Sequence, residues 1–139
     1  MNEQDQIQIA REVVDAFGAS NWERSSQLLS NTVYHELATQ RHITGWDDIL
    51  EVFKGWKQAM PDIFGTVTSA ISSGNQVTLE ITWEGTHTGP LVTPDGTIEA
   101  SGKSQKTPSA WIFEFEGGNI KESRHYFDLL TFLQQIGAA

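Results

Sequence analysis

Apolar and polar residues alternate over most of the second half of the sequence, and this pattern constrains the fold more than any other feature. The alternation is most regular over residues 76–86, whose apolar members are Val77, Leu79, Ile81 and Trp83. A period of two is typical of a strand with one face against a core. Ser73-Gly74-Asn75 predicts a hairpin turn that joins this strand to another over residues 64–72.

Two further strands are predicted nearer the C-terminus. Residues 101–116 place Trp111, Phe113 and Phe115 on one face, and residues 120–127 return after a turn at Gly117-Gly118-Asn119. Residues 88–98 contain two prolines and two glycines, and we expect a loop that forms a lid or rim of a pocket. Apolar residues between 129 and 136 predict a short terminal helix.

The first 60 residues follow helical spacing instead. Helices are predicted over residues 3–17, near 22–29 and from Thr44 to about Pro61. Residues 33–39 alternate as a strand that places His35 on the same side as Val33 and Leu37. Helices that precede antiparallel strands with short turns indicate an α+β fold, in which the helices pack on one face of a curved antiparallel sheet. A length of 139 residues suits one domain, 1–139.

Charge and composition exclude several classes of function. The net charge of −9 disfavours nucleic acid and anionic membrane surfaces as partners. The sequence contains no cysteine, which rules out disulfides, thiolate nucleophiles and cysteine-bound metals. Neither a signal peptide nor a segment of membrane-spanning length is present, so we expect a cytoplasmic protein.

Asp128 is the first candidate for a functional residue, because it lies between the last strand and the terminal helix among aromatic and aliphatic neighbours. Burial at such a junction would raise the pKa of the carboxyl group towards a catalytic value. Aspartate is also a preferred N-cap residue, so Asp128 would equally begin the terminal helix. Both interpretations remain open at this point.

A strongly curved sheet closed by helices would enclose a pocket with aromatic walls. Strand parity places His87 at the end of an apolar row, and we expect His87 and Asp128 to be polar groups inside the pocket. On the last strand, Arg124 and Tyr126 share the parity of Asp128. The residues that we expect to contact a substrate are His35, Phe53, Trp56, Trp83, Leu91, Trp111, Phe113 and Tyr126.

Several short motifs resemble a known family. They are Gly85-Thr86-His87-Thr88-Gly89-Pro90-Leu91, Pro94-Asp95-Gly96-Thr97, Ser101-Gly102-Lys103, Phe113-Glu114-Phe115, Gly117-Gly118-Asn119-Ile120, Tyr126-Phe127-Asp128 and Leu133-Gln134-Gln135-Ile136-Gly137. Together they resemble the SnoaL-like polyketide cyclase (ester cyclase) family, a branch of the nuclear-transport-factor-2-like superfamily. The resemblance extends over essentially the whole chain.

This resemblance implies a cone-shaped α+β barrel with a deep pocket, in a homodimer or homotetramer. It also implies that an aromatic polyketide ester is cyclised by an intramolecular aldol reaction without a cofactor or metal ion. The family's acid–base carboxylate corresponds to Asp128, and a pocket histidine corresponds to His87. Arg124 would help to orient the substrate oxygen, and the aromatic walls would hold a hydrophobic, carbonyl-bearing small molecule.

Two alternatives stay open. The domain could bind a hydrophobic small molecule without catalysis. It could also resemble the epoxide hydrolases or isomerases of the superfamily, because Arg124, Tyr126 and Asp128 lie on one strand face; that chemistry needs a second carboxylate, from Glu122 or Glu36. The four histidines show no compact metal-binding spacing, and no Gly-x-Ser-x-Gly motif is present.

Overall fold

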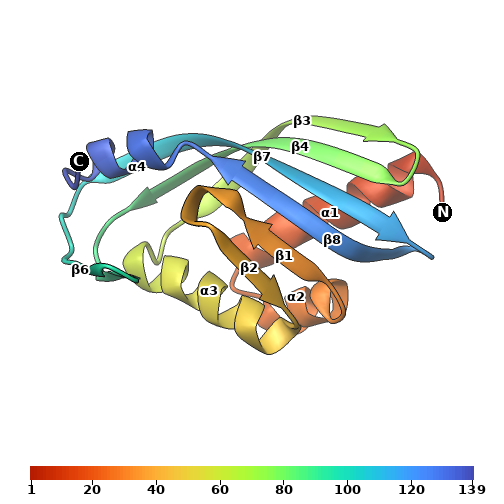
Figure 1. Ribbon diagram of the computed structural model, residues 1–139. Helices are drawn as coiled ribbons and strands as arrows, with labels where there is room; N and C mark the ends of the chain where they lie inside the picture. Colours follow the sequence, from red (N-terminus) through yellow and green to blue (C-terminus); the bar gives the residue numbers. More distant parts are fainter.

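Six strands form one curved mixed sheet, in the order β2-β1-β8-β7-β4-β3. The computed structural model describes all residues, 1–139. The strands are β1 (Val33–Glu36), β2 (Arg41–Thr44), β3 (Phe64–Ser73), β4 (Gln76–Thr86), β7 (Ser104–Glu116) and β8 (Asn119–Phe127). A separate two-stranded sheet is formed by β5 (Leu91–Thr93) and β6 (Gly96–Ile98). The long strands β3, β4, β7 and β8 form the body of the molecule (Figure 1).

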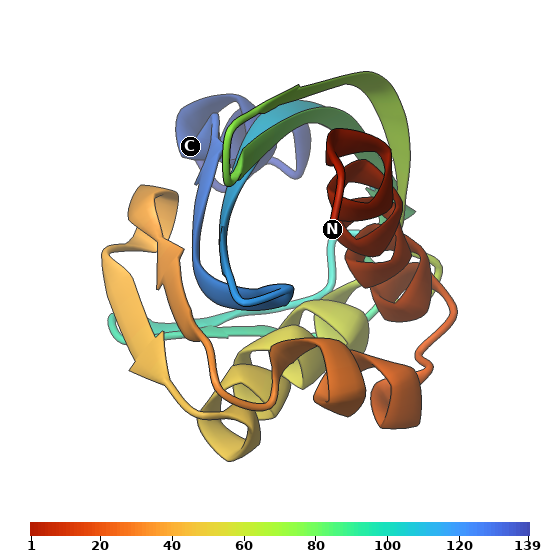
Figure 2. The same ribbon diagram turned by 90° about the vertical axis from the view of Figure 1, so that its right-hand side faces the viewer.

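Four helices accompany the sheet: α1 (Glu3–Gly18), α2 (Trp22–Leu29), α3 (Trp46–Ala59) and α4 (Leu129–Gln135). A capping box between Asn2 and Asp5 begins α1, and the side chain of Asn21 caps α2. The sheet curls over the interior, and α1, α2 and α3 close its open side (Figure 2). The predicted α+β class with helices on one face of a curved sheet is therefore confirmed.

Aromatic side chains fill the space between the sheet and the helices. Trp111, at 2% exposure, lies at the centre and packs against Tyr34, Phe53 and Trp83 with ring centroids 5.7, 6.3 and 6.5 Å away. Edge and tilted contacts of this kind suit the quadrupoles of aromatic rings. The apolar rows of β4 and β7 supply the floor of this core, as the alternation predicted.

The N-terminal part of the sheet differs from the prediction. Residues 33–39 were expected to be one strand, but β1 ends at Glu36 and a 3-10 turn over Leu37–Thr39 leads into β2. Gln40 makes the reversal with a left-handed φ of 58°. All strand pairs of the main sheet are antiparallel except β1 with β8, which is parallel, so the sheet is mixed and the expectation of a purely antiparallel one was wrong.

The region between β4 and β7 is more ordered than a plain loop. It folds into the β5–β6 hairpin, and Leu91 is buried in the core at 6% exposure. The backbone N–H groups of Thr88 and Gly89 both donate to the carbonyl of Ala59, which fixes the start of this region at the end of α3. Gly89 leaves no room for a side chain there, because a Cβ atom would lie 2.0 Å from the Gln58 carbonyl oxygen. No helix is long and apolar enough to span a membrane.

Candidate functional site

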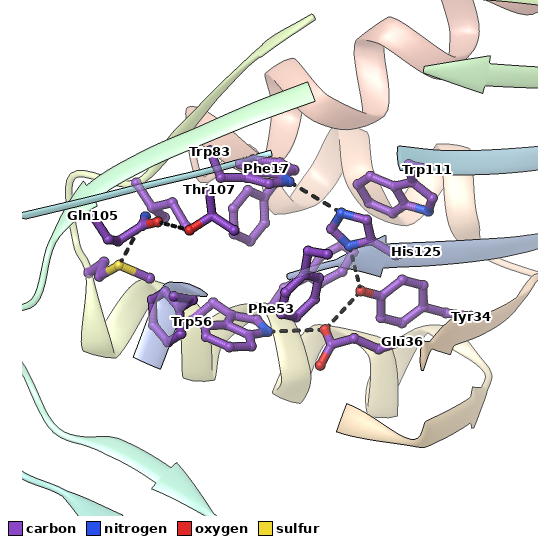
Figure 3. Close-up of a pocket in the computed structure, with 14 residues that line it drawn as sticks. Phe17, Tyr34, Glu36, Phe53, Trp56, Trp83, Gln105, Thr107, Trp111 and His125 are labelled. Atoms are coloured by element: carbon purple, nitrogen blue, oxygen red, sulfur yellow. Dashed lines mark hydrogen bonds between the residues drawn. The ribbon is translucent and has the colours of Figure 1, made fainter. Parts of the chain in front are cut away.

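A narrow cavity of about 60 Å³ lies between the concave face of the sheet and helices α1 and α3. Aromatic side chains form most of its wall, and polar side chains lie at two ends (Figure 3). Its lining is Phe17, Tyr34, Glu36, Phe53, Trp56, Met60, Ile63, Trp83, Gln105, Thr107, Trp111, His125, Phe127 and Phe132. An apolar cavity with a few convergent polar groups is the usual form of a small-molecule site.

Glu36 is the charged anchor of the first polar end, and it is 1% exposed. One carboxylate oxygen, Oε1, accepts from Arg41 Nη2 at 2.6 Å and from Thr39 Oγ1 at 2.6 Å. The other, Oε2, accepts from the Tyr34 hydroxyl at 2.8 Å and from Trp56 Nε1 at 3.1 Å. Burial opposes ionisation of Glu36, but the charge of Arg41 and the hydrogen bonds from Thr39 and Arg41 outweigh it and lower its pKa. Glu36 is therefore a carboxylate at neutral pH.

Tyr34 connects this carboxylate to His125. Its hydroxyl oxygen lies 3.2 Å from His125 Nδ1, and Trp83 Nε1 donates to His125 Nε2 at 3.2 Å. Because an indole N–H is only a donor, Nε2 must carry a lone pair, and neutral His125 must hold its proton on Nδ1. Hydrogen bonds therefore run in one direction, from His125 through Tyr34 to Glu36 (Figure 3).

His125 is held neutral by its surroundings. It is 6% exposed and stacks on Trp111, with ring centroids 4.6 Å apart and planes 17° from parallel. Burial lowers the pKa of His125 to about 4, although the charge of Glu36 acts in the opposite direction. Burial, followed by the charge of Glu36, raises the pKa of Tyr34 well above its usual value. At neutral pH the cavity thus contains a neutral imidazole, a phenol and one carboxylate.

Gln105 and Thr107 form the second polar end. The Gln105 amide accepts from the Thr107 hydroxyl at 2.6 Å, and its Nε2 donates to the Met60 sulfur at 3.5 Å. Both residues are buried, at 4% and 3% exposure. Because a thioether is a weak acceptor, the amide N–H groups of Gln105 are only partly satisfied.

The predicted position of Asp128 differs from the observed one. Asp128 is the N-cap of α4 and lies at the surface, where it does not line the cavity. Its Oδ1 accepts from the Thr131 backbone N–H at 3.0 Å and its Oδ2 from the Thr131 hydroxyl at 2.6 Å. These hydrogen bonds, that of the hydroxyl first, lower the pKa of Asp128. Burial, the expected cause of a raised pKa, is absent.

Arg124 and Tyr126 also lie on the outer face of the sheet and not in the pocket. Arg124 bonds to Glu114 at 2.6 Å and to Glu122 at 3.2 Å, and Tyr126 is 43% exposed. The reason is a β-bulge in the hairpin of β7 and β8, where the register shifts beside Glu114 and Phe115. A shift of one residue exchanges the two faces of a strand, so His125 comes to lie opposite Trp111.

His87 is buried, as its parity suggested, but it does not line the cavity. Its Nδ1 accepts from the Ser101 backbone N–H at 3.2 Å and contacts the Ser101 hydroxyl at 2.9 Å. Neutral His87 must therefore carry its proton on Nε2, a buried atom that has no partner. His87 joins the end of β4 to the segment before β7.

Half of the predicted contact residues meet in the cavity. Phe53, Trp56, Trp83 and Trp111 line it. Leu91 and Phe113 are buried elsewhere in the core, and His35 lies on the outer face, half-buried beside His42. The parity of β1 was assigned the wrong way round, because Tyr34 and Glu36 face inwards.

Sequence reasoning missed Tyr34 and His125 as site residues, and it named Glu36 only as a possible second carboxylate for the epoxide-hydrolase alternative. The sequence did carry a signal for them. Hydrogen-bonding side chains occupy every second position in both β1 and β8, and the two strands pair in parallel with Glu36 opposite His125. No group of three or more histidine, aspartate or glutamate side chains is arranged to hold a metal ion.

Comparison with solved structures shows the same fold in several proteins. TsrD from Streptomyces laurentii superposes with a TM-score of 0.84 at 19% identity, covering 100% of this chain and 99% of that one. IdmH from Streptomyces antibioticus, proposed to be a polyketide cyclase, gives 0.80 at 20% identity, over 95% and 98% of the two chains. A protein from Catenulispora acidiphila with a ketosteroid isomerase-like fold, in complex with trimethylamine, gives 0.78 at 21% identity, over 94% and 93%.

Comparison with curated proteins gives no match. The sequence model of the family described as SnoaL-like polyketide cyclase matches residues 7–136, nearly the whole chain. The fold seen in the structural relatives agrees with that match. The chain therefore belongs to the SnoaL-like polyketide cyclase family.

Proposed function

We propose that this protein is a cofactor-independent cyclase that moves a proton on a hydrophobic, carbonyl-bearing small molecule bound in the aromatic cavity. One observation carries the proposal: Trp83 Nε1–H donates to His125 Nε2 inside the cavity, at 3.2 Å. A hydrogen-bond donor and a base lie side by side and satisfy each other while no substrate is bound. A ketone offers the complementary pair, a carbonyl oxygen that accepts and an α-carbon that gives up a proton.

The reaction would begin with an exchange of partners. The substrate carbonyl oxygen accepts the indole N–H of Trp83, which frees the lone pair of His125 Nε2. Nε2 then takes the α-proton, and the electron pair of the broken C–H bond forms an enolate whose oxygen stays bonded to Trp83. The enolate carbon attacks a second carbonyl of the same molecule to close the ring, and His125 returns its proton to the new alkoxide. No redox partner is required.

The Tyr34–Glu36 pair supports the proton transfer. In the resting site His125 is neutral, with a pKa of about 4. As Nε2 gains the proton, the imidazolium retains its Nδ1–H bond to Tyr34, and the charge of Glu36 favours this protonated state. The surrounding rings exclude water, which strengthens these interactions.

Substrate binding needs the cavity to widen. Its volume is about 60 Å³, whereas sites for ring-sized ligands are typically about 300 Å³ or more. Phe127 and Phe132 form part of the wall and pack edge-on against Trp56, at 5.8 and 5.6 Å between ring centroids. Movement of α4, which carries Phe132, would open the space between these rings.

His125 replaces Asp128 in this proposal because of where the two side chains lie. Asp128 was predicted as the acid/base, with His87 and Arg124 as its partners, but none of the three lines the cavity. His125 does, and it contacts a donor on one nitrogen and a charged network on the other. His87 and Arg124 then have roles in joining strands.

An assay of α-proton exchange tests the proposal without the natural substrate. The wild-type protein should accelerate exchange of the α-protons of aryl methyl ketones in D₂O, measured by proton NMR. His125→Gln should lower this rate by about 100-fold or more, the usual contribution of a positioned general base. Trp83→Phe should lower it less, because the base remains. Asp128→Asn is the matched control, and loss of exchange in that variant alone would return the acid/base role to Asp128.

A non-catalytic binding domain is the second candidate, because the ring nitrogens of His125, the Tyr34 hydroxyl and the Glu36 carboxylate already have partners within the protein. Such a domain would quench its tryptophan fluorescence when an aryl ketone binds, yet would exchange no α-protons. The epoxide-hydrolase alternative is less favoured, because Glu36 is the one carboxylate that lines the cavity. A homodimer or homotetramer remains a prediction, which light scattering after gel filtration would test.

A further inference from the structure

Two histidines meet on the outer face of the sheet, away from the cavity. His35 on β1 and His42 on β2 are register partners, and their Nδ1 atoms lie 2.7 Å apart. The His42 ring is exposed, and the His35 side chain is 23% exposed. The proposed cyclase reaction uses neither side chain.

A carboxylate lies behind this pair. Glu122 Oε1 is 3.6 Å from His35 Nε2 and favours the proton of the His35 ring on that nitrogen. His35 Nδ1 then presents its lone pair, and His42 Nδ1 must donate into it. Metal-binding histidines commonly have a closer form of this arrangement, in which the far ring N–H donates a hydrogen bond to a carboxylate; here the contact is 3.6 Å, within reach of an ion pair. The local charge is negative, because Glu114 and Glu122 share the single guanidinium of Arg124.

We propose that His35 and His42 form a binding site for a divalent transition-metal ion of the kind that prefers imidazole, Zn²⁺, Ni²⁺ or Cu²⁺. Both Nδ1 atoms would be ligands, and water would complete the coordination, because no third histidine or carboxylate converges on the pair. Zinc–nitrogen bonds of about 2.0–2.1 Å in a tetrahedral site separate two nitrogens by about 3.3 Å. Small rotations of the two rings supply that widening.

Binding would leave the number of protons unchanged. His42 gives up the proton on Nδ1 as that nitrogen becomes a ligand, and the same ring takes up a proton on Nε2. His35 already carries its proton on Nε2 in the tautomer that Glu122 favours. Both rings are neutral in the complex, as metal ligation requires.

A bound ion would fasten β1 to β2. These two strands carry the cavity network on their other side, since Tyr34 and Glu36 flank His35, and Arg41 precedes His42. The ion would hold the register in which Arg41 reaches Glu36. This inference does not depend on the proposed reaction, because metal binding is measured on the protein without substrate.

Isothermal titration of the full chain, prepared without a histidine tag, tests the site. At about pH 7.5 we expect one Ni²⁺ or Zn²⁺ to bind and Mg²⁺ not to bind. His35→Gln and His42→Gln should each weaken binding at least tenfold. Glu122→Gln should weaken it about tenfold, as loss of the carboxylate behind a ligand does. Glu80→Gln, another exposed carboxylate, should leave it unchanged.

Two results would overturn the site. Binding that survives in the double variant His35→Gln/His42→Gln places the ion elsewhere on the protein, and equal binding of Mg²⁺ marks a non-specific effect of the negative charge. Circular dichroism shows whether each variant is folded. The Cu²⁺ complex gives an independent readout, because its electron paramagnetic resonance spectrum should show two imidazole nitrogens in the wild type and fewer in either single variant.

Discussion

The sheet carries two arginine–glutamate pairs of equal length on its two sides. Arg41 meets Glu36 at 2.6 Å and Arg124 meets Glu114 at 2.6 Å, but the Glu36 side chain is 1% exposed and that of Glu114 is 40% exposed. The distance between the charged atoms alone therefore says little about how much an ion pair contributes to the stability of the fold. The buried carboxylate must replace its lost hydration with protein donors, whereas the exposed one keeps its water.

The surroundings of the two carboxylates follow from this difference. Glu36 accepts hydrogen bonds from Tyr34, Thr39, Arg41 and Trp56, side chains that come from β1, β2, α3 and the turn between the strands. Glu114 bonds to Arg124 alone. The inner pair thus fixes four parts of the chain relative to one another, and the outer pair joins two neighbouring strands that are already paired.

The largest expected effect is that of Glu36→Ala. Removing one partner of a buried ion pair, together with the acceptor of Tyr34 and Trp56, should lower the free energy of unfolding by about 3–5 kcal/mol. Urea denaturation followed by tryptophan fluorescence measures this change. Glu114→Ala is the matched control and should cost about 0–1 kcal/mol. Equal losses in the two variants would contradict the distinction between the inner and outer pairs.

Acid should destabilise the inner network in a defined pH window. The folded pKa of His125 is about 4, below the unfolded value of about 6.5. In this window the unfolded chain binds a proton that the folded protein does not, so stability falls as the pH decreases from about 6.5 to 4. The total loss from His125 should be about 3 kcal/mol. The lowered pKa of Glu36 adds a further loss at lower pH, as that carboxylate becomes protonated.

Urea titrations at several pH values would isolate the contribution of His125. His125→Phe keeps a ring that can stack on Trp111, so the variant should be folded at neutral pH. Its stability should change less than that of the wild type between about pH 6.5 and 4. An identical pH dependence in the two proteins would show that His125 is not the group that titrates.

Local patterns in the sequence predicted the fold better than they predicted the site. The regular alternation over residues 76–86 and the spacing of α1 and α3 fixed these elements, because one face of each meets the core. The site depends on which face of β8 is turned inwards. One extra residue in the bulge beside Phe115 decides that, and the turn Gly117-Gly118-Asn119 gives no sign of it.

The short strand β1 shows the same limit. β1 has only four residues, and each of its two faces carries one apolar or aromatic and one polar side chain, so the sequence does not indicate which face is buried. Its parallel partner β8 is about 90 residues away in sequence. His125 lies inside because β7 and β1 pair on either side of β8, in registers that depend on the whole sheet. Glu36 is tolerated inside because Arg41, across a turn with unusual φ at Gln40, reaches it.

The smallest expected effect is that of replacing Asp128, the residue that directly follows the end of β8. Asp128→Ala removes the N-cap of α4 and should lower the melting temperature by a few degrees, while Asp128→Ser retains an acceptor and should restore most of it. Neither change should slow α-proton exchange by the folded protein. A stable Asp128→Ala variant without exchange activity would mean that Asp128, the N-cap residue of α4, turns into the cavity when substrate binds. The proton would then move through Asp128, and the division between the inner and outer faces of β8 would hold only for the free protein.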